Sequence, residues 1–145
     1  MKKQQYSAVI KAPKEKLWNI LWGKGTYEQW TAVFSEGSTA VTDWQQGSKV
    51  LFLDGKGEGM VGKIAERREN EYLSIEHLGI VKDGKEITDG PEVNPWSGAH
   101  ENYTLKEENG TTTLEVDMDI TDEMKDYFDN TWPKALDKLK EMAEG

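Results

Sequence analysis

The side chains best suited to acid–base chemistry in this chain are its two histidines, His77 and His100, and the carboxylate of Glu101. A paired imidazole and carboxylate can move a proton, or can form the polar end of an otherwise apolar pocket. The chain contains no cysteine, which excludes disulfides and thiolate chemistry. No zinc-ligand spacing and no nucleophile-elbow pattern accompany the histidines, so we expect no metal, no cofactor and, on balance, no catalysis.

A hairpin turn at Asn109-Gly110 places Glu101 on the covered face of a predicted sheet. Asn-Gly is the strongest short-range signal for a two-residue hairpin loop, because both positions need a positive φ. This loop sets Leu105 opposite Leu114, Tyr103 opposite Val116, Glu101 opposite Met118 and Ala99 opposite Ile120. Side chains alternate along a strand, so these residues share one apolar face. A carboxylate there is costly without a partner, so we expect Glu101 to be mostly buried and to reach His77 or a cavity water.

Alternation assigns the two histidines to opposite faces of the sheet. His77 is in phase with Leu73 and Ile75, so we expect its imidazole to face inward. His100 directly precedes Glu101 and is therefore expected to face solvent. An inward pair of His77 and Glu101 has two interpretations, a structural contact beneath a helix or the polar end of a ligand pocket.

One glycine pattern has the spacing of a nucleotide-binding fingerprint but lacks its structural context. Gly57, Gly59 and Gly62 fit G-x-G-x-x-G, but no helix opens at the motif and no βαβ unit surrounds it. We interpret this stretch as a glycine-rich hairpin with a β-bulge.

The elements that must position these residues form an α+β pattern, with helices on one face of a curved antiparallel sheet. Strands are predicted near 4–11, 38–44, 48–54, 59–68, 72–81, 98–108 and 111–120. Residues 82–97 break the pattern, with a small hairpin at Asp83-Gly84 and a long loop ending at Trp96. Two short helices are expected after the first strand, one opening at Pro13 and one over 26–34.

A long amphipathic helix is predicted from Thr121 or Asp122 to the C-terminus. Pro133 lies within its apolar stripe and removes one backbone hydrogen bond. We therefore expect a bend there, where the helix passes from covering a pocket to packing on the end of the sheet.

Length and charge narrow the class of protein. The 145 residues suit one domain, 1–145, and a net charge of −9 argues against nucleic acid or an anionic membrane as a partner. No signal-peptide pattern and no membrane-length apolar run are present. We expect a cytoplasmic, soluble protein that is a monomer or weak dimer.

Several collinear segments resemble a START-like (SRPBCC) helix-grip domain. They are IKAPKEKLWNIL near the start, W at position 30, DW at 43–44, GSKVLF at 47–52, LSIEHLG at 73–79, WSGAHENYTL at 96–105, NGTTTL at 109–114 and WPKALDKLK at 132–140. The branch they resemble most is the C-terminal domain of the activator of the ninety-kilodalton heat-shock-protein ATPase. The resemblance implies a curved sheet of about six or seven strands wrapped on the long C-terminal helix, often with a cavity for an apolar molecule. It also implies that the strands holding His77 and Glu101 are neighbours.

The six tryptophans divide by position. Trp18 and Trp132 lie on apolar helix stripes and are expected in the core, whereas Trp22 and Trp44 are interpreted as partly buried structural residues. In the resembled fold, the elements that carry Trp30 and Trp96 flank a cavity mouth, where aromatic rings suit ligand contact. Core packing is an equal alternative for both.

The favoured hypothesis is a binding module for a small apolar molecule, lipid-like or aromatic. Its candidate ligand-binding residues are Trp30, Phe52, Ile75, His77, Trp96, Glu101, Tyr103, Met118, Phe128 and Trp132. Two alternatives stay open, a chaperone-ATPase-activator-like interaction domain that docks on a heat-shock chaperone and a cyclase- or hydrolase-type enzyme that uses Glu101 and His77. An open aromatic cavity favours binding, and an exposed apolar patch favours docking.

Overall fold

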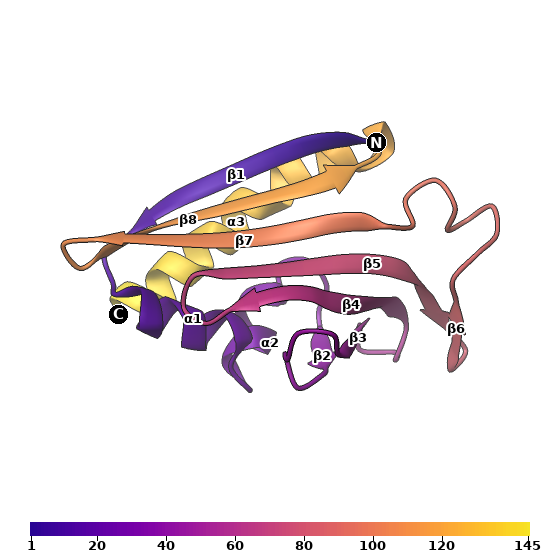
Figure 1. Cartoon of the computed structure of the whole chain (residues 1–145), viewed down its shortest axis with the longest axis horizontal. Helices are drawn as coiled ribbons and strands as arrows, with labels where there is room; N and C mark the ends of the chain where they lie inside the picture. The colour runs from indigo at the N-terminus through magenta and orange to yellow at the C-terminus, as the bar shows by residue number, and fades with distance from the viewer.

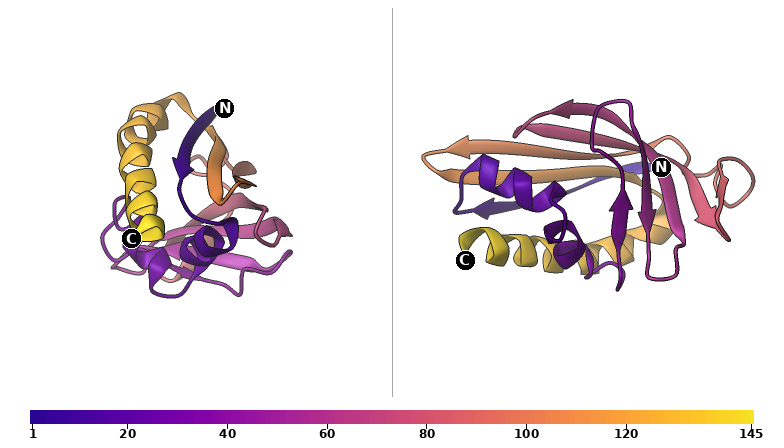
Figure 2. Two further views of the ribbon diagram at one scale, coloured as in Figure 1. Left: turned by 90° about the vertical axis from the view of Figure 1, so that its left-hand side faces the viewer. Right: turned by 90° about the horizontal axis from the view of Figure 1, so that it is seen from below.

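A curved antiparallel sheet wraps around a long C-terminal helix in the computed structural model, which describes all residues from Met1 to Gly145 (Figures 1 and 2). The strands are β1 (Lys2–Ile10), β2 (Thr39–Val41), β3 (Lys49–Leu53), β4 (Gly59–Arg68), β5 (Tyr72–Lys82), β6 (Lys85–Ile87), β7 (Ala99–Glu108) and β8 (Thr111–Ile120). The helices are α1 (Lys14–Trp22), α2 (Thr26–Thr31), the 3-10 turn η1 (Asp122–Met124) and α3 (Lys125–Glu144). The predicted α+β helix-grip fold is confirmed.

The strands follow the order β1-β8-β7-β5-β4-β3-β2, and β6 pairs with β5 beyond this path. All the pairings are antiparallel, including β5 with β7, so the strands that carry His77 and Glu101 are neighbours as expected. The predicted hairpin at Asp83-Gly84 is confirmed by the pairing of Lys82 with Lys85.

The β7–β8 hairpin has the predicted register. Glu101 pairs with Met118, Tyr103 with Val116, and Leu105 with Leu114. Asn109 and Gly110 adopt φ values of 54° and 79°, the left-handed conformation that this turn requires. Leu114 and Val116 are fully buried, so the inner face of the hairpin forms part of the core.

The apolar stripe of α3 closes the concave side of the sheet. Trp132, Ala135, Leu136, Leu139 and Ala143 are buried in one cluster with residues of α1, β1, β7 and β8. The helix is continuous from Lys125 to Glu144 with Pro133 inside it. None of the helices combines the length and apolar character that a membrane crossing requires.

Three predicted elements were longer than the observed ones. The strand expected over 38–44 is reduced to Thr39–Val41, because Trp44 has a φ of 60° and its N–H bonds the Thr42 hydroxyl in a turn. Helix α2 ends at Thr31. The long helix begins at Lys125 instead of Thr121, because Thr121 makes no side-chain cap and residues 122–124 form a 3-10 turn.

The glycine-rich hairpin is confirmed, but its β3–β4 register is regular and the bulges lie in the pairing of β4 with β5. Strands β3 and β4 pair across the turn at 54–58, and the β4–β5 register shifts between Val61 and Gly62 and again between Ile64 and Glu66. No helix follows the motif, so it is not a nucleotide-binding loop.

Candidate functional site

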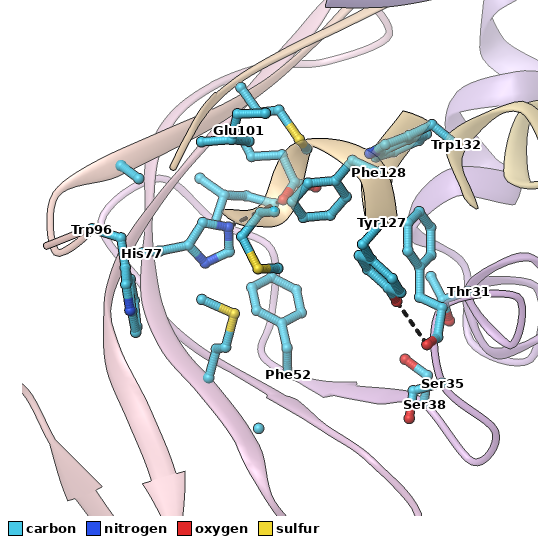
Figure 3. A pocket seen from close by; sticks show the side chains of 18 of the residues that line it. Thr31, Ser35, Ser38, Phe52, His77, Trp96, Glu101, Tyr127, Phe128 and Trp132 are labelled. Atoms are coloured by element: carbon cyan, nitrogen blue, oxygen red, sulfur yellow. Dashed lines mark hydrogen bonds and ion pairs between the residues drawn. The ribbon is translucent and has the colours of Figure 1, made fainter. Parts of the chain in front are cut away.

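A cavity of about 540 Å³ lies between the concave face of the sheet, α2 and the first half of α3 (Figure 3). Of its 29 lining residues, 18 are hydrophobic, so the space is mainly apolar. All ten candidate residues from the sequence line this one cavity: Trp30, Phe52, Ile75, His77, Trp96, Glu101, Tyr103, Met118, Phe128 and Trp132. Their role in binding a ligand stays a prediction.

The polar end of the cavity is built around Glu101. His77 Nε2 lies 3.1 Å from Glu101 Oε1, and the Tyr103 hydroxyl donates to Glu101 Oε2. The side chains of His77 and Glu101 are 13% and 18% exposed. The expected inward pair is therefore confirmed, and the carboxylate is mostly buried with a partner on each oxygen.

The hydrogen bonds assign the protons of this cluster. Both Glu101 oxygens accept, which suits the ionised carboxylate. His77 Nδ1 is buried without a partner, so a proton there would be an unsatisfied donor, and we assign the ring as neutral with its proton on Nε2. Burial, and next the charge of Glu101, raise the pKa of Tyr103 and of Tyr27, so both phenols keep their protons at neutral pH.

An aromatic wall faces the sheet side of the cavity. The Trp132 ring lies 5.0 Å from Phe34, 6.1 Å from Trp30 and 6.0 Å from Tyr103, measured between ring centroids. Trp30 is 2% exposed and its Nε1 donates to the Leu21 carbonyl, so it packs in the core as well as lining the cavity. Trp132 is also buried as predicted.

Trp96 and the start of α3 lie on opposite sides of the cavity (Figure 3). Trp96 is half-buried, and its Nε1 donates to the Glu92 carbonyl within the same loop. Met124 and Tyr127 are 41% and 42% exposed, and the Tyr127 hydroxyl donates to the Phe34 carbonyl at 2.9 Å. Sequence reasoning missed Met124 and Tyr127 as lining residues, although their helical spacing with Phe128 was the available signal.

Two expectations about single residues need correction. His100 lies on the face opposite Glu101, but it is half-buried: its Nδ1 is 3.1 Å from the Ser74 hydroxyl, and its backbone N–H donates to Asp119. Trp22 is 8% exposed rather than partly buried, because its ring packs edge-on against Tyr103 at 4.8 Å.

Comparisons with known proteins agree with this architecture. Residues 11–144 match the family model described as Activator of Hsp90 ATPase homolog 1-like protein. A search among curated proteins finds no match.

Three solved structures illustrate the structural likeness. The Aha1 dimer from Colwellia psychrerythraea is 20% identical, with 99% of this chain and 97% of that chain covered and a TM-score of 0.74. A protein from Cytophaga hutchinsonii is 24% identical over 99% and 94% of the two chains, with a TM-score of 0.73. Protein MLL2253 from Mesorhizobium loti is 16% identical over 99% and 97%, with a TM-score of 0.72. At these identities the likeness concerns the fold.

Proposed function

The chain belongs to the family of Activator of Hsp90 ATPase homolog 1-like proteins, and we propose that it is a binding module for a small, largely apolar molecule. The ligand would occupy the cavity between the sheet and α3. The single observation that carries this proposal is a cavity of about 540 Å³ beside a core cluster of 24 buried residues. Pockets for small molecules span about 300–1,000 Å³ and are mainly apolar with a few polar groups.

The size of the cavity argues against a packing defect. An empty enclosed void costs on the order of 24 cal/mol per Å³, so leaving this volume dry would cost about 13 kcal/mol. That approaches the entire stability of a typical domain. Water inside would leave aromatic surface wetted, whereas an apolar ligand would bury it. The cavity is therefore best explained as space for a ligand.

Polar groups at one end suit orientation of that ligand. Glu101 is held by His77 and Tyr103, so its position is fixed before a ligand arrives. We assign Glu101 the role of a polar anchor. The ten predicted residues provide both the anchor and the apolar walls.

The alternative is docking on a heat-shock chaperone, which the family description suggests. Docking favours a contiguous exposed apolar patch. The exposed large apolar residues are instead distributed over the N-terminus, β1, β2, β6, η1 and α3: Met1, Val9, Val41, Ile87, Met124 and Tyr127. This distribution favours the cavity over a docking surface. We further propose a cytoplasmic location, which the cysteine-free composition supports. We also propose a monomer or weak dimer, and the likeness to a structure described as an Aha1 dimer is compatible with the dimer.

Thermal unfolding with a library of apolar molecules tests the proposal. A ligand at a hundred times its Kd stabilises the folded state by about 2.7 kcal/mol, which raises the Tm by several degrees. Met60 lines the cavity between Phe52 and Ile80 on neighbouring strands. Met60→Trp places a larger ring in the cavity and should obstruct the ligand, which reduces the rise in Tm.

Val41→Trp supplies the matched control, because Val41 is 55% exposed and lies outside the cavity lining. The rise in Tm on addition of the ligand should persist in this variant. The proposal is overturned if no library member raises the Tm of the native chain, or if Met60→Trp responds like the native chain.

A further inference from the structure

Carboxylates line the cavity, but lysine and arginine do not. Its four acidic lining residues are Asp54, Glu58, Glu101 and Asp119. The Asp119 carboxylate accepts the His100 N–H on the outer face, and Asp54 accepts N–H groups within the β3–β4 turn. Glu58 lies at the end of the same turn. Glu101 is the acid hydrogen-bonded to His77 and Tyr103, so it defines the charge at the polar end of the cavity.

No cation neutralises Glu101. Its only ion-pair partner is His77, whose ring is assigned as neutral because Nδ1 has no acceptor. Lys125, at the start of α3, is held by Asp129 at 2.6 Å instead. A carboxylate has about four acceptor sites, and the donors from His77 and Tyr103 use two of them. Glu101 thus keeps both its charge and free acceptor capacity.

Aromatic rings surround the space into which a ligand would extend. Phe52 lies 5.8 Å from the His77 ring on the sheet side, and Phe128 and Trp132 line the α3 side (Figure 3). Aromatic faces attract cations, and this attraction is stronger in a desolvated site. A carboxylate together with aromatic walls therefore favours a cationic group and disfavours an anionic one.

We infer that the cavity selects molecules carrying a protonated amine on an apolar body and rejects those carrying a carboxylate. This inference rests on the proposed function and names the chemical class of its ligand. The ammonium donates to Glu101, and the apolar body lies among the aromatic rings. Fatty acids and other organic anions are excluded, because their charge would meet Glu101 without a compensating cation.

Three fluorescent probes with one polycyclic body test this selection: 1-pyrenemethylamine, 1-pyrenemethanol and 1-pyrenecarboxylic acid. Fluorescence titration of the native chain should give the tightest binding for the amine and the weakest for the acid. A charge-assisted hydrogen bond predicts a difference of about tenfold or more between these two. This comparison needs no variant, so it tests the inference even if a variant fails to fold.

Glu101→Gln removes the charge of the side chain while conserving its size. The affinity for the amine probe should then exceed the affinity for the acid probe by only about threefold or less. Glu115→Gln removes the same charge from the outer face of β8 and should leave the ratio of these two affinities unchanged. Circular dichroism would establish that both variants are folded. Equal binding of amine and acid, or a ratio that survives Glu101→Gln, overturns the inference but leaves the proposed function standing. Binding of none of the three probes overturns the inference, and the proposed function is overturned as well if no member of the apolar library raises the Tm.

Discussion

At the residue scale, the polar end of the cavity depends on a buried carboxylate that is hydrogen-bonded on both oxygens. Tyr103 is 2% exposed and supplies one of these hydrogen bonds. Burial of such a group is tolerated only while its partners are present. The cluster of His77, Glu101 and Tyr103 is therefore a structural unit as well as the proposed anchor.

Tyr103→Phe should lower the free energy of unfolding by about 1–3 kcal/mol, because one Glu101 oxygen loses its donor inside the protein. Urea denaturation measures this change. Tyr127→Phe is the control, since Tyr127 is 42% exposed and water replaces its bond to the Phe34 carbonyl. Its loss should stay below about 1 kcal/mol. Equal losses in the two variants would contradict the assigned cluster.

Asp129 in α3 is hydrogen-bonded to side chains of β1, and its ionisation makes the free energy of unfolding depend on pH. Its carboxylate accepts hydrogen bonds from Lys125 at 2.6 Å, Tyr6 at 2.8 Å and Gln4 at 2.9 Å. Lys125 contributes most, followed by Tyr6, and together they lower the pKa of Asp129. The folded pKa thus lies below the unfolded value of about 3.9, so this stabilisation is present above that pH and is lost as pH falls through the folded pKa.

Asp129→Asn should therefore be less stable than the native chain near neutral pH. The difference should shrink on acidification below about pH 4, where the native carboxylate becomes protonated. Urea unfolding at about pH 7 and about pH 3 compares the two proteins. A difference that is identical at both pH values would show that the charge of Asp129 does not stabilise the fold.

Strand alternation could place His77 and Glu101 because β5 and β7 pair regularly there, with His77 opposite Ala99 and Ile75 opposite Glu101. The same alternation assigns Ile80 to the outer face of the sheet, although Ile80 also lines the cavity. Between the pairs Gly62–His77 and Val61–Gly79, β5 contains one extra residue, and the phase of its side chains reverses. Gly79 directly follows the extra residue and is the signal that could have marked the bulge, since a glycine inside a strand often does so. The prediction took β5 as regular and therefore stopped at His77.

At the element scale, Pro133 divides α3 into two functional parts. Four α3 and η1 residues before it line the cavity: Met124, Tyr127, Phe128 and Trp132. None after it does so, and Leu136 and Leu139 pack in the core instead. The apolar stripe of the C-terminal helix predicted that its first part covers the cavity and its second part packs in the core. The predicted start of the helix was wrong because the 3-10 turn at 122–124 has a helix-like composition. A bend at Pro133 stays a prediction.

Pro133→Ala should restore the N–H that the Asp129 carbonyl lacks and reduce the predicted bend. The first part of α3 would then move relative to the sheet, so binding of a cavity ligand should weaken several-fold while the protein stays folded. Ligand titration and circular dichroism measure the two effects. Lys134→Ala, on the exposed side of the helix, is the matched control. Unchanged ligand affinity in Pro133→Ala would contradict this role of the proline.

At the scale of the whole molecule, the element order and the hairpin register predicted the sheet, the covering helix and the inner face. The cavity volume could not be predicted, since it depends on sheet curvature and on the distance between α3 and β3–β5. The sequence pattern specifies which side chains face inward, as with Met118 and Ile75, but not how much space they leave.

We predict that residues 1–145 unfold as one domain. The buried residues of α1, β1, β5, β7, β8 and α3 form one cluster, so none of these six elements can detach without exposing core surface. Tryptophan fluorescence and far-ultraviolet circular dichroism should report coincident urea transitions. Two separate transitions would contradict a single cooperative domain.

The central claim, that the cavity holds a small molecule, is tested most directly by native mass spectrometry. The protein is purified without denaturation from the cells that make it. Besides the 16.5 kDa chain, we predict a complex heavier by roughly a few hundred daltons, depleted in Met60→Trp and retained in Val41→Trp. The mass of the bare chain alone, under conditions that preserve non-covalent complexes, would contradict the claim.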